Sequence, residues 1–320
     1  MRPMHRALLV AVIALSGGCA VPAAEPAPSD RPILADLVQT VELGRLAPPS
    51  PDASGITYDD ERDKFIIVDS EVEEGRFYRG VNMWTLTRRG VIGATGSTLK
   101  YSREPSGVAL DPRTRRLFVS DDNNDQVFEV RAGRDSRLGT NDDVRSQTDV
   151  RIFGDKDTED IAFDTSTGDL LLIDAKRGRI HRLGSGPNRR FDGVPPHGDD
   201  TSCSIDISGL GATDVEGISY DARRGTIFLV SHRTAYIYEV TSDGRLVSLI
   251  DISEVYPSKA AGLALAPASS GDGSRSIYIV DRGVDNNKDA TARDGTLYEF
   301  RVRLPPHDRN KRKHACSKVS

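Results

Sequence analysis

Five similar segments of alternating apolar and polar residues recur along this chain, and they restrict its fold more than any other feature. The clearest copy, residues 106–130, reads SGVALDPRTRRLFVSDDNNDQVFEV. Its first residues alternate, Asp111 and Pro112 begin a turn, and a short apolar run ends at the acidic stretch DDNND. Alternation bounded by Gly, Pro and Asp is typical of short β-strands. The segment therefore predicts three consecutive strands.

The copies are spaced like the blades of a β-propeller. They start at residues 54, 106, 159, 216 and 261, which gives spacings of 52, 53, 57 and 45 residues. Third strands follow at residues 83–87, 127–130, 179–183, 235–240 and 296–302, and outer fourth strands are expected at 91–95, 149–153, 204–207 and 246–252. Four strands per repeat at this period predict an all-β chain that folds as a single five-bladed β-propeller.

The last repeat lacks a fourth strand after it, and residues 37–43 can supply that strand. Such an arrangement closes the ring with strands from both chain ends and leaves no free edge. A sixth blade would have to lie in residues 184–212, which are polar and interrupted by prolines. The propeller domain is therefore expected to span residues 36–304.

The repeat also resembles a known group of proteins. The pattern Gly-Ile-Ala, a turn, Leu-Phe followed by Asp, and then Arg-Ile is similar to the NHL and TolB-like propeller repeats over nearly all of residues 36–303. Residues 68–74 with 80–82, and residues 278–287, resemble segments of a family of exported bacterial propellers. Six blades are usual in the NHL and TolB-like groups, so the resemblance implies six where the repeats give five. Resemblance of fold does not imply a particular reaction.

The two chain ends differ in composition from the repeats. Arg2 and Arg6 precede an apolar run that ends at Ser16-Gly17-Gly18-Cys19, so residues 1–19 predict a secretory signal peptide. Lipidation of Cys19, as in bacterial lipoproteins, and ordinary cleavage near residues 20–24 both stay open. Residues 20–35, rich in Pro, Ala and Ser, predict a flexible linker. Residues 305–320 predict a basic disordered tail.

Charge and cysteine content limit the partners of the chain. Its net charge is −5, although the tail carries five basic residues and no acidic residue after position 308. The acidic body argues against a nucleic-acid partner, and membrane contact is expected only through a lipid on Cys19 or through the basic tail. Pairing of Cys203 with Cys316 is compatible with export and stays open. The spacing of Cys and His fits no structural zinc site.

Propeller geometry predicts a functional site at one mouth of the central channel. The first residue of each inner strand, Glu159 and Glu216 among them, should face this mouth. The second strands end on the same rim, at Asp69, Asp121, Asp174 and Asp281. Crowded carboxylates repel one another, and Ca²⁺ relieves that repulsion with oxygen ligands. At the level of the fold, the chain resembles six-bladed lactonases and organophosphate hydrolases, which hold a central Ca²⁺ in this manner.

A structural role for the four rim aspartates is the competing interpretation. An aspartate that ends a strand often accepts hydrogen bonds from the backbone of the following turn. Repetition in four of five blades is what such a role predicts, because a binding site needs asymmetry. Glu159 and Glu216 are more informative, because Ser or Ala stands at the equivalent position of the other blades.

Two loops add a second argument for a cation. Asp285, Asn287 and Asp289 place oxygen side chains at the spacing that opens an EF-hand loop, and residues 121–125 do the same. Neither loop continues the motif, because its sixth position lacks Gly and its twelfth lacks Glu. These half-motifs fit a Ca²⁺ loop and an ordinary Asn/Asp-rich turn equally.

His232 is the histidine best placed to act as a base. It follows the second strand of the fourth blade, and Ser231 and Glu216 could complete a hydrolytic set with Ser54 or Ser106. The sequence contains no G-x-S-x-G motif to support such a set. We therefore expect an exported cell-envelope propeller that binds a small molecule or an envelope protein. The alternative is a Ca²⁺-dependent hydrolase of the lactonase, esterase or phosphoesterase type with its site at the channel mouth.

Overall fold

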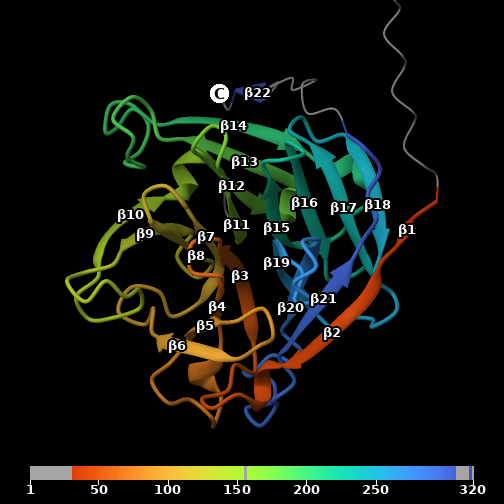
Figure 1. Cartoon of the computed structure of the whole chain (residues 1–320). Helices are drawn as coiled ribbons and strands as arrows, with labels where there is room; N and C mark the ends of the chain where they lie inside the picture. The colour runs from red at the N-terminus through yellow and green to blue at the C-terminus, as the bar shows by residue number, and fades with distance from the viewer. Residues whose placement is uncertain (1–30, 155–156, 308–316, 319–320) are drawn as a thin grey trace, which may run out of the picture.

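The chain forms a β-propeller whose five blades are arranged in a ring (Figure 1). The computed structural model describes residues 31–154, 157–307 and 317–318. Within them the regular structure is β-strand apart from a few single 3-10 turns, and no helix is long and apolar enough to cross a membrane. The prediction of an all-β propeller with five blades is confirmed.

Each blade is an antiparallel sheet with its first strand innermost. The first blade contains β3 (Ala53–Asp59), β4 (Lys64–Asp69), β5 (Met83–Leu86) and β6 (Ile92–Gly96); the second contains β7 (Pro105–Leu110), β8 (Leu117–Asp121), β9 (Gln126–Arg131) and β10 (Val144–Asp149). The third contains β11 (Thr158–Asp164), β12 (Asp169–Asp174), β13 (Arg179–Gly184) and β14 (Thr201–Asp206); the fourth contains β15 (Val215–Asp221), β16 (Thr226–Ser231), β17 (Tyr236–Thr241) and β18 (Leu246–Asp251). The fifth contains β19 (Ala260–Pro267), β20 (Arg275–Asp281), β21 (Thr296–Arg301) and, from the N-terminal side, β2 (Asp36–Glu42).

The ring closes with strands from both ends of the chain, as predicted. β2 pairs antiparallel with β21, so that Leu37 lies opposite Phe300 and Thr40 opposite Tyr298. Figure 1 shows the two strands side by side, one coloured as the start of the chain and the other as its end. Pairing of β2 with β21 covers the edge that the fifth blade would otherwise expose.

Two short strands fall inside segments predicted to lack structure. β1 (Ile33–Leu34) pairs parallel with β18, inside the predicted linker of residues 20–35. β22 (Ser317–Lys318) pairs antiparallel with β14, inside the predicted tail of residues 305–320. Both pairings extend the outer edge of a blade, because an exposed edge strand can pair with a short extended segment of almost any composition.

The outer strand of the second blade is also displaced from its predicted position. Residues 149–153 were expected to form it, but β10 ends at Asp149 and Val150–Phe153 form a 3-10 turn, η3, that buries Val150 and Phe153. The sequence of β10, VRSQTD, is mostly exposed and shows no apolar alternation. An edge strand of this kind has no apolar periodicity. The outer strand was therefore predicted at the apolar residues that follow it.

The core consists of five apolar clusters, each between two neighbouring blades. In the cluster between the first and fifth blades, the rings of Phe65 and Tyr278 lie 4.6 Å apart. Trp84 is 1% exposed and donates its indole N–H to the Pro48 carbonyl at 3.1 Å. Full burial of one such large side chain contributes about 1.5–3 kcal/mol.

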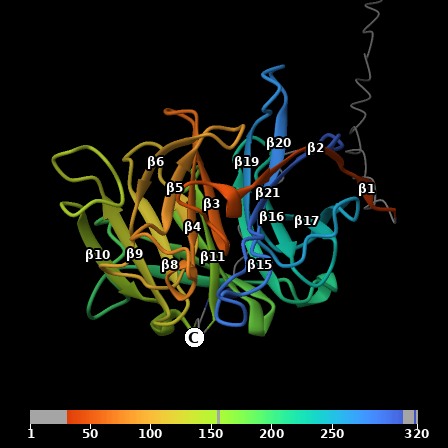
Figure 2. The ribbon, with the colours of Figure 1, turned by 90° about the horizontal axis from the view of Figure 1, so that it is seen from below.

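Every inner strand contains a bulge near its first residue. The pairing register with the second strand shifts at Ser54, Ser106, Glu159, Glu216 and Ala261. A bulge redirects the side chain of the extra residue, and bulges are frequent beside active sites. All five bulges lie where the inner strands begin, which is the end of the channel that we call its mouth. Figure 2 shows the inner strands β3, β11, β15 and β19 near the middle of the molecule.

Directly after the bulges the inner strands approach one another closely, since a Cβ at Gly55 would lie 2.7 Å from Gly107 Cα. We call this level of the channel the neck. Four blades place a glycine there, Gly55, Gly107, Gly217 and Gly262, whereas the third blade places Asp160. The buried Asp160 carboxylate accepts hydrogen bonds from the Ile161 and Ile218 amides at 2.8 and 2.9 Å. A Cβ at Gly107 would lie 2.2 Å from Asp160 Oδ1, so only glycine leaves room for this carboxylate.

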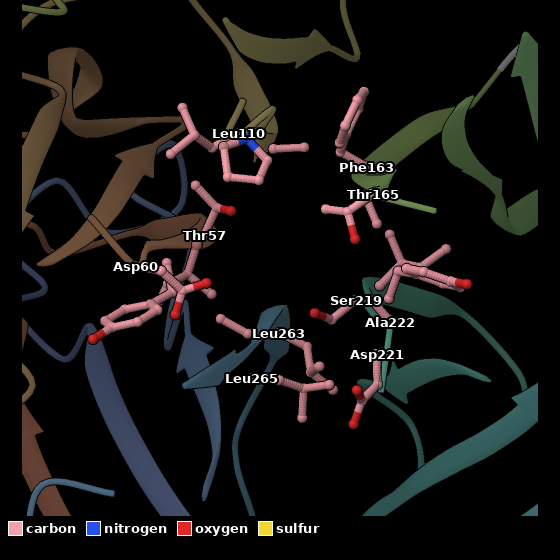
Figure 3. Close-up of a pocket in the computed structure, with 18 of the residues that line it drawn as sticks. Thr57, Asp60, Leu110, Phe163, Thr165, Ser219, Asp221, Ala222, Leu263 and Leu265 are labelled. Atoms are coloured by element: carbon pink, nitrogen blue, oxygen red, sulfur yellow. The ribbon is translucent and has the colours of Figure 1, made fainter. Parts of the chain in front are cut away.

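A separate cavity of about 330 Å³ lies beyond the neck, lined by residues that follow it on the five inner strands. Figure 3 shows Thr57, Leu110, Phe163, Ser219 and Leu263 around this cavity. The inner strands begin at the mouth and run past the neck to the cavity, so Asp160 separates the two ends of the channel.

Candidate functional site at the channel mouth

Two positions of each blade supply most of the charged residues at the mouth. The first is the bulge residue of the inner strand, which is Glu159 in the third blade and Glu216 in the fourth. The second is the residue directly after the second strand, which is Asp122, His232 or Arg282 in three of the blades. Each of these residues adjoins a strand, so the sheet fixes the backbone position from which its side chain projects.

Arg282 lies between carboxylates of the first blade. Its Nε donates to Asp52 at 2.8 Å and its Nη2 to Glu71 at 2.9 Å. Burial lowers the pKa of Arg282, but the charges and hydrogen bonds of Asp52 and Glu71 outweigh it and raise the pKa above its ordinary value. Burial also raises the pKa of Asp52 to about 7, against the opposing effect of Arg282. The guanidinium is a fixed positive charge at the mouth.

Glu159 lies in a group of three carboxylates on its side of the mouth. One ligand oxygen from each of Asp122, Asp157 and Glu159 lies within 4.8 Å of the other two. Burial, followed by the charges of Glu216, Asp122 and Asp157, raises the pKa of Glu159 to about 9. Burial and the charge of Asp157 also raise the pKa of Asp122 to about 6. Lys176 partly compensates this group, because its ammonium donates to Asp157.

Glu216 lies beside His232. Its Oε1 is 2.9 Å from His232 Nδ1, and both side chains are largely buried, with 12% and 17% exposed. His232 Nε2 is 4.0 Å from Asp214. A carboxylate beside one ring nitrogen favours a proton there and leaves the other nitrogen as a base. Glu216 and His232 were predicted as site residues, and the structure brings them together.

The other predicted metal ligands at the rim make backbone contacts. Amide groups of the following or neighbouring loops donate to Asp69 (from Asp52), Asp121 (from Asn124), Asp174 (from Arg177) and Asp281 (from Ser258 and Lys259). All four aspartates are almost fully buried. These contacts are the ones that a structural role predicts.

The half-motif at residues 285–289 does not gather around one point. Lys259 and Lys288 donate to Asp285 at 2.8 and 2.6 Å. Although burial raises the pKa of Asp285, these ammonium groups lower it to about 2. Asp289 caps its own turn by accepting from the Thr291 amide, and the Asn287 amide lies 3.5 Å from Glu71.

The serine hydroxyls considered as nucleophiles donate to backbone carbonyls. Ser54 donates to Pro105 at 2.7 Å and Ser106 to Thr158 at 2.9 Å, which ties neighbouring inner strands together. Ser231 donates to Thr213. A hydroxyl held in this way is not oriented for attack on a substrate.

The sequence prediction did not single out several residues of the mouth. They are Asp52, Glu71, Glu104, Asp122, Asp157 and Arg282. Glu104 directly precedes β7, and burial together with the charges of Asp122 and Glu71 raises its pKa to about 7. The signal for Asp122 and Arg282 was their shared position after the second strand. Asp157 and Glu104 lie in connections, where the repeat gives no alignment.

No family model and no curated protein matches this chain. Solved structures match its fold. Glutaminyl cyclase of Myxococcus xanthus has a TM-score of 0.55 at 12% identity and covers 86% of this chain and 100% of its own. A gluconolactonase of Xanthomonas campestris has a TM-score of 0.45 at 12% identity, covering 88% and 99%, and a luciferin-regenerating enzyme has a TM-score of 0.47 at 12% identity, covering 85% and 98%. At these identities the similarity shows a shared β-propeller fold and nothing further.

Proposed function

We propose that this protein is a hydrolase of small esters or lactones, with a divalent cation held at the channel mouth by Asp122, Asp157 and Glu159. The observation that carries the proposal is the convergence of these three carboxylates beside the Glu216–His232 pair. Burial, followed by the negative charges of Glu216, Asp122 and Asp157, raises the pKa of Glu159, so carboxylates are crowded here. A Ca²⁺ ion, which prefers oxygen ligands, relieves the repulsion between them.

The residues around this site can each take a different role in hydrolysis. A cation would supply Lewis-acid polarisation of the substrate carbonyl. With a proton on His232 Nδ1, which the Glu216 carboxylate 2.9 Å away favours, Nε2 can accept a proton from water as the water attacks the carbonyl carbon. His232 then returns that proton to the leaving alkoxide, which departs as an alcohol. Arg282 balances part of the negative charge around the pair.

Hydrolysis rates with and without Ca²⁺ test this function. The panel should contain lactones, carboxylic esters, phosphoesters and a peptide with N-terminal glutamine, since a structural neighbour is a glutaminyl cyclase. We expect turnover of an ester or lactone that is lost on chelation and reduced about 10²–10⁴-fold by His232→Gln. Turnover that survives chelation would contradict the cation-dependent mechanism.

A binding module is the second candidate. It is favoured by one observation, that Ser54, Ser106 and Ser231 each donate their hydroxyl to the backbone. A binding module predicts ligand-induced stabilisation at the mouth without turnover of any substrate in the panel.

We further propose that the protein is exported. The disulfide bond of Cys203 supports this location, because such bonds form in oxidising compartments. Its predicted partner, Cys316, lies outside the described residues, as do residues 1–30, which include the predicted signal peptide.

A further inference from the structure

The connection between β13 and β14, residues 185–200, lies across the second and third blades. Phe191 is 6% exposed and packs edge-on against Phe118, with ring centroids 5.5 Å apart. The Phe191 carbonyl accepts a hydrogen bond from Thr148 of β10 at 2.6 Å. A long loop without regular structure thus covers the joint between two blades, and its conformation affects how these blades are held together.

Three carboxylates of this loop point toward one another. One ligand oxygen from each of Asp192, Asp199 and Asp200 lies within 4.8 Å of the other two. Asp200 is 3% exposed, and its Oδ2 accepts a hydrogen bond from the Gly193 amide at 2.7 Å. Its Oδ1 is buried and has no hydrogen-bond partner, and the same is true of Asp199 Oδ1. Two buried, unpaired carboxylate oxygens in one loop are costly unless something binds them.

No positive side chain of the described residues compensates this group. The ion pairs formed there include none with Asp192, Asp199 or Asp200. Burial, together with the charges of Asp192 and Asp199, raises the pKa of Asp200 to about 6. Close to neutral pH the three side chains therefore carry a net negative charge that no ion pair among the described residues balances.

Two glycines leave room for these carboxylates. A Cβ at Gly198 would lie 2.2 Å from Asp192 Oδ1, and a Cβ at Gly186 would lie 2.5 Å from Asp199 Oδ1. Gly186 also has a φ of +59°, which disfavours other residues. Larger residues at either position would push the carboxylates away from their present arrangement.

We propose that Asp192, Asp199 and Asp200 form a binding site for Ca²⁺, separate from the channel mouth, that fastens residues 185–200 across the second and third blades. The ligands are carboxylate oxygens, which suits a hard cation, and backbone carbonyls and water can complete its coordination. His197 is exposed and outside the group, so the ligand set does not suit zinc. Three protein carboxylates predict an affinity typical of extracellular modules, about 0.1–1 mM.

Calorimetry and thermal unfolding of the full chain test the proposal. A Glu159→Gln background weakens the site at the mouth, so that the remaining Ca²⁺ binding reports on the loop. In this background we expect binding of about one Ca²⁺ per chain and a rise in Tm of about 2–6 °C at about 5 mM Ca²⁺. The added pair Asp199→Asn and Asp200→Asn should abolish both effects, whereas Asp36→Asn, at an exposed position of β2, should leave them intact.

Hydrogen exchange keeps the test decisive if the double variant folds poorly. Ca²⁺ should slow amide exchange of residues 185–200 at least threefold in the Glu159→Gln protein and leave the first blade unchanged. Absence of both binding and protection in that protein would overturn the proposal. It would also be overturned if the double variant Asp199→Asn, Asp200→Asn raised the Tm equally with and without Ca²⁺. Protonation alone would then relieve the repulsion between the carboxylates. Neither result bears on hydrolysis at the mouth, since that site uses other residues.

Discussion

Arg282 is a buried positive charge at the mouth, and its contacts explain why its position is fixed. The side chain is 11% exposed and donates to Asp52 and Glu71, both of which are also buried. Loss of one partner of a buried ion pair leaves the other charge unpaired in a poorly solvated place. The geometry also suits arginine better than lysine, because two different nitrogens donate to two carboxylates.

Replacement of Arg282 should therefore destabilise the protein strongly. We expect Arg282→Met to lower the free energy of unfolding by about 3–5 kcal/mol, measured by urea denaturation. Arg282→Lys should recover only part of this loss. The control is Arg233→Met, because Arg233 is 64% exposed in its ion pair with Asp214 and should contribute less than about 1 kcal/mol. Equal stability of the two methionine variants would contradict the account of the mouth.

Glu159 should make stability fall as the pH rises. Its folded-state pKa of about 9 is far above the ordinary value of 4.5, so the folded protein keeps a proton that the unfolded chain loses. The stabilisation is complete below about pH 4.5 and is lost as the pH approaches 9. Without divalent cations, Glu159→Gln should therefore gain in Tm relative to the native protein between pH 5 and 9, by about 2–5 °C. A constant difference in Tm across this range would show that Glu159 has no raised pKa.

At the scale of elements, the inner and second strands were predicted well and the outer strands less well. β12 (Asp169–Asp174) contains the buried apolar run LLLI beside a turn with Gly168, so period and turn agree. β10 has neither an apolar run nor alternation, because it is an exposed edge strand. β1 and β22 have two residues each and depend entirely on their partner strands. No local pattern could predict them.

The neck is held by one carboxylate that joins several blades. Asp160 of β11 accepts a hydrogen bond from the Ile218 amide of β15. Burial raises the pKa of Asp160 well above its ordinary value, and hydrogen bonds from backbone amides, those of Val108 and Leu263 among them, oppose this shift. Asp160→Asn replaces an acceptor oxygen by a donor that faces N–H groups. We expect it to cost about 1–3 kcal/mol in urea denaturation. The exposed Asp60→Asn, at the far end of the channel, should cost less than about 0.5 kcal/mol; an equal cost would contradict the role of the neck.

Ring closure by β2 provides a second test at this scale. Removal of residues 31–42 uncovers the edge of β21 and weakens the packing around Phe300, which is fully buried. We expect loss of the single cooperative thermal transition and association of the truncated chains, which size-exclusion chromatography detects. A shorter deletion ending at Leu34 removes only β1 and should keep the cooperative transition. If both truncated proteins behaved alike, closure by β2 would not be important for stability.

At the scale of the whole molecule, the propeller brings to one mouth residues that are far apart in the sequence. Glu159, Glu216 and His232 could be proposed from the sequence because they depart from their repeat positions. Asp122 and Arg282 could have been found by comparing, among the five blades, the residue that directly follows the second strand. Asp157 and Glu104 could not, because connections between blades vary in length and path and give no alignment.

The two cation sites that we propose differ in purpose. Asp122, Asp157 and Glu159 lie beside a base at the mouth, whereas Asp192, Asp199 and Asp200 lie in a loop across the joint of two blades. The first should govern turnover and the second stability. Variants of each group should therefore affect one property and leave the other, and hydrolysis rates with Tm values check this separation.

The most direct test of the site at the mouth is a crystal structure of the full chain with about 5 mM Ca²⁺ at pH near 7.5. We expect density for one ion about 2.3–2.6 Å from oxygens of Asp122, Asp157 and Glu159, with water completing its coordination. The account would be contradicted if that position held no ion while the Glu159 carboxyl donated a hydrogen bond to Glu216, because Glu159 would then be a protonated acid and not a cation ligand.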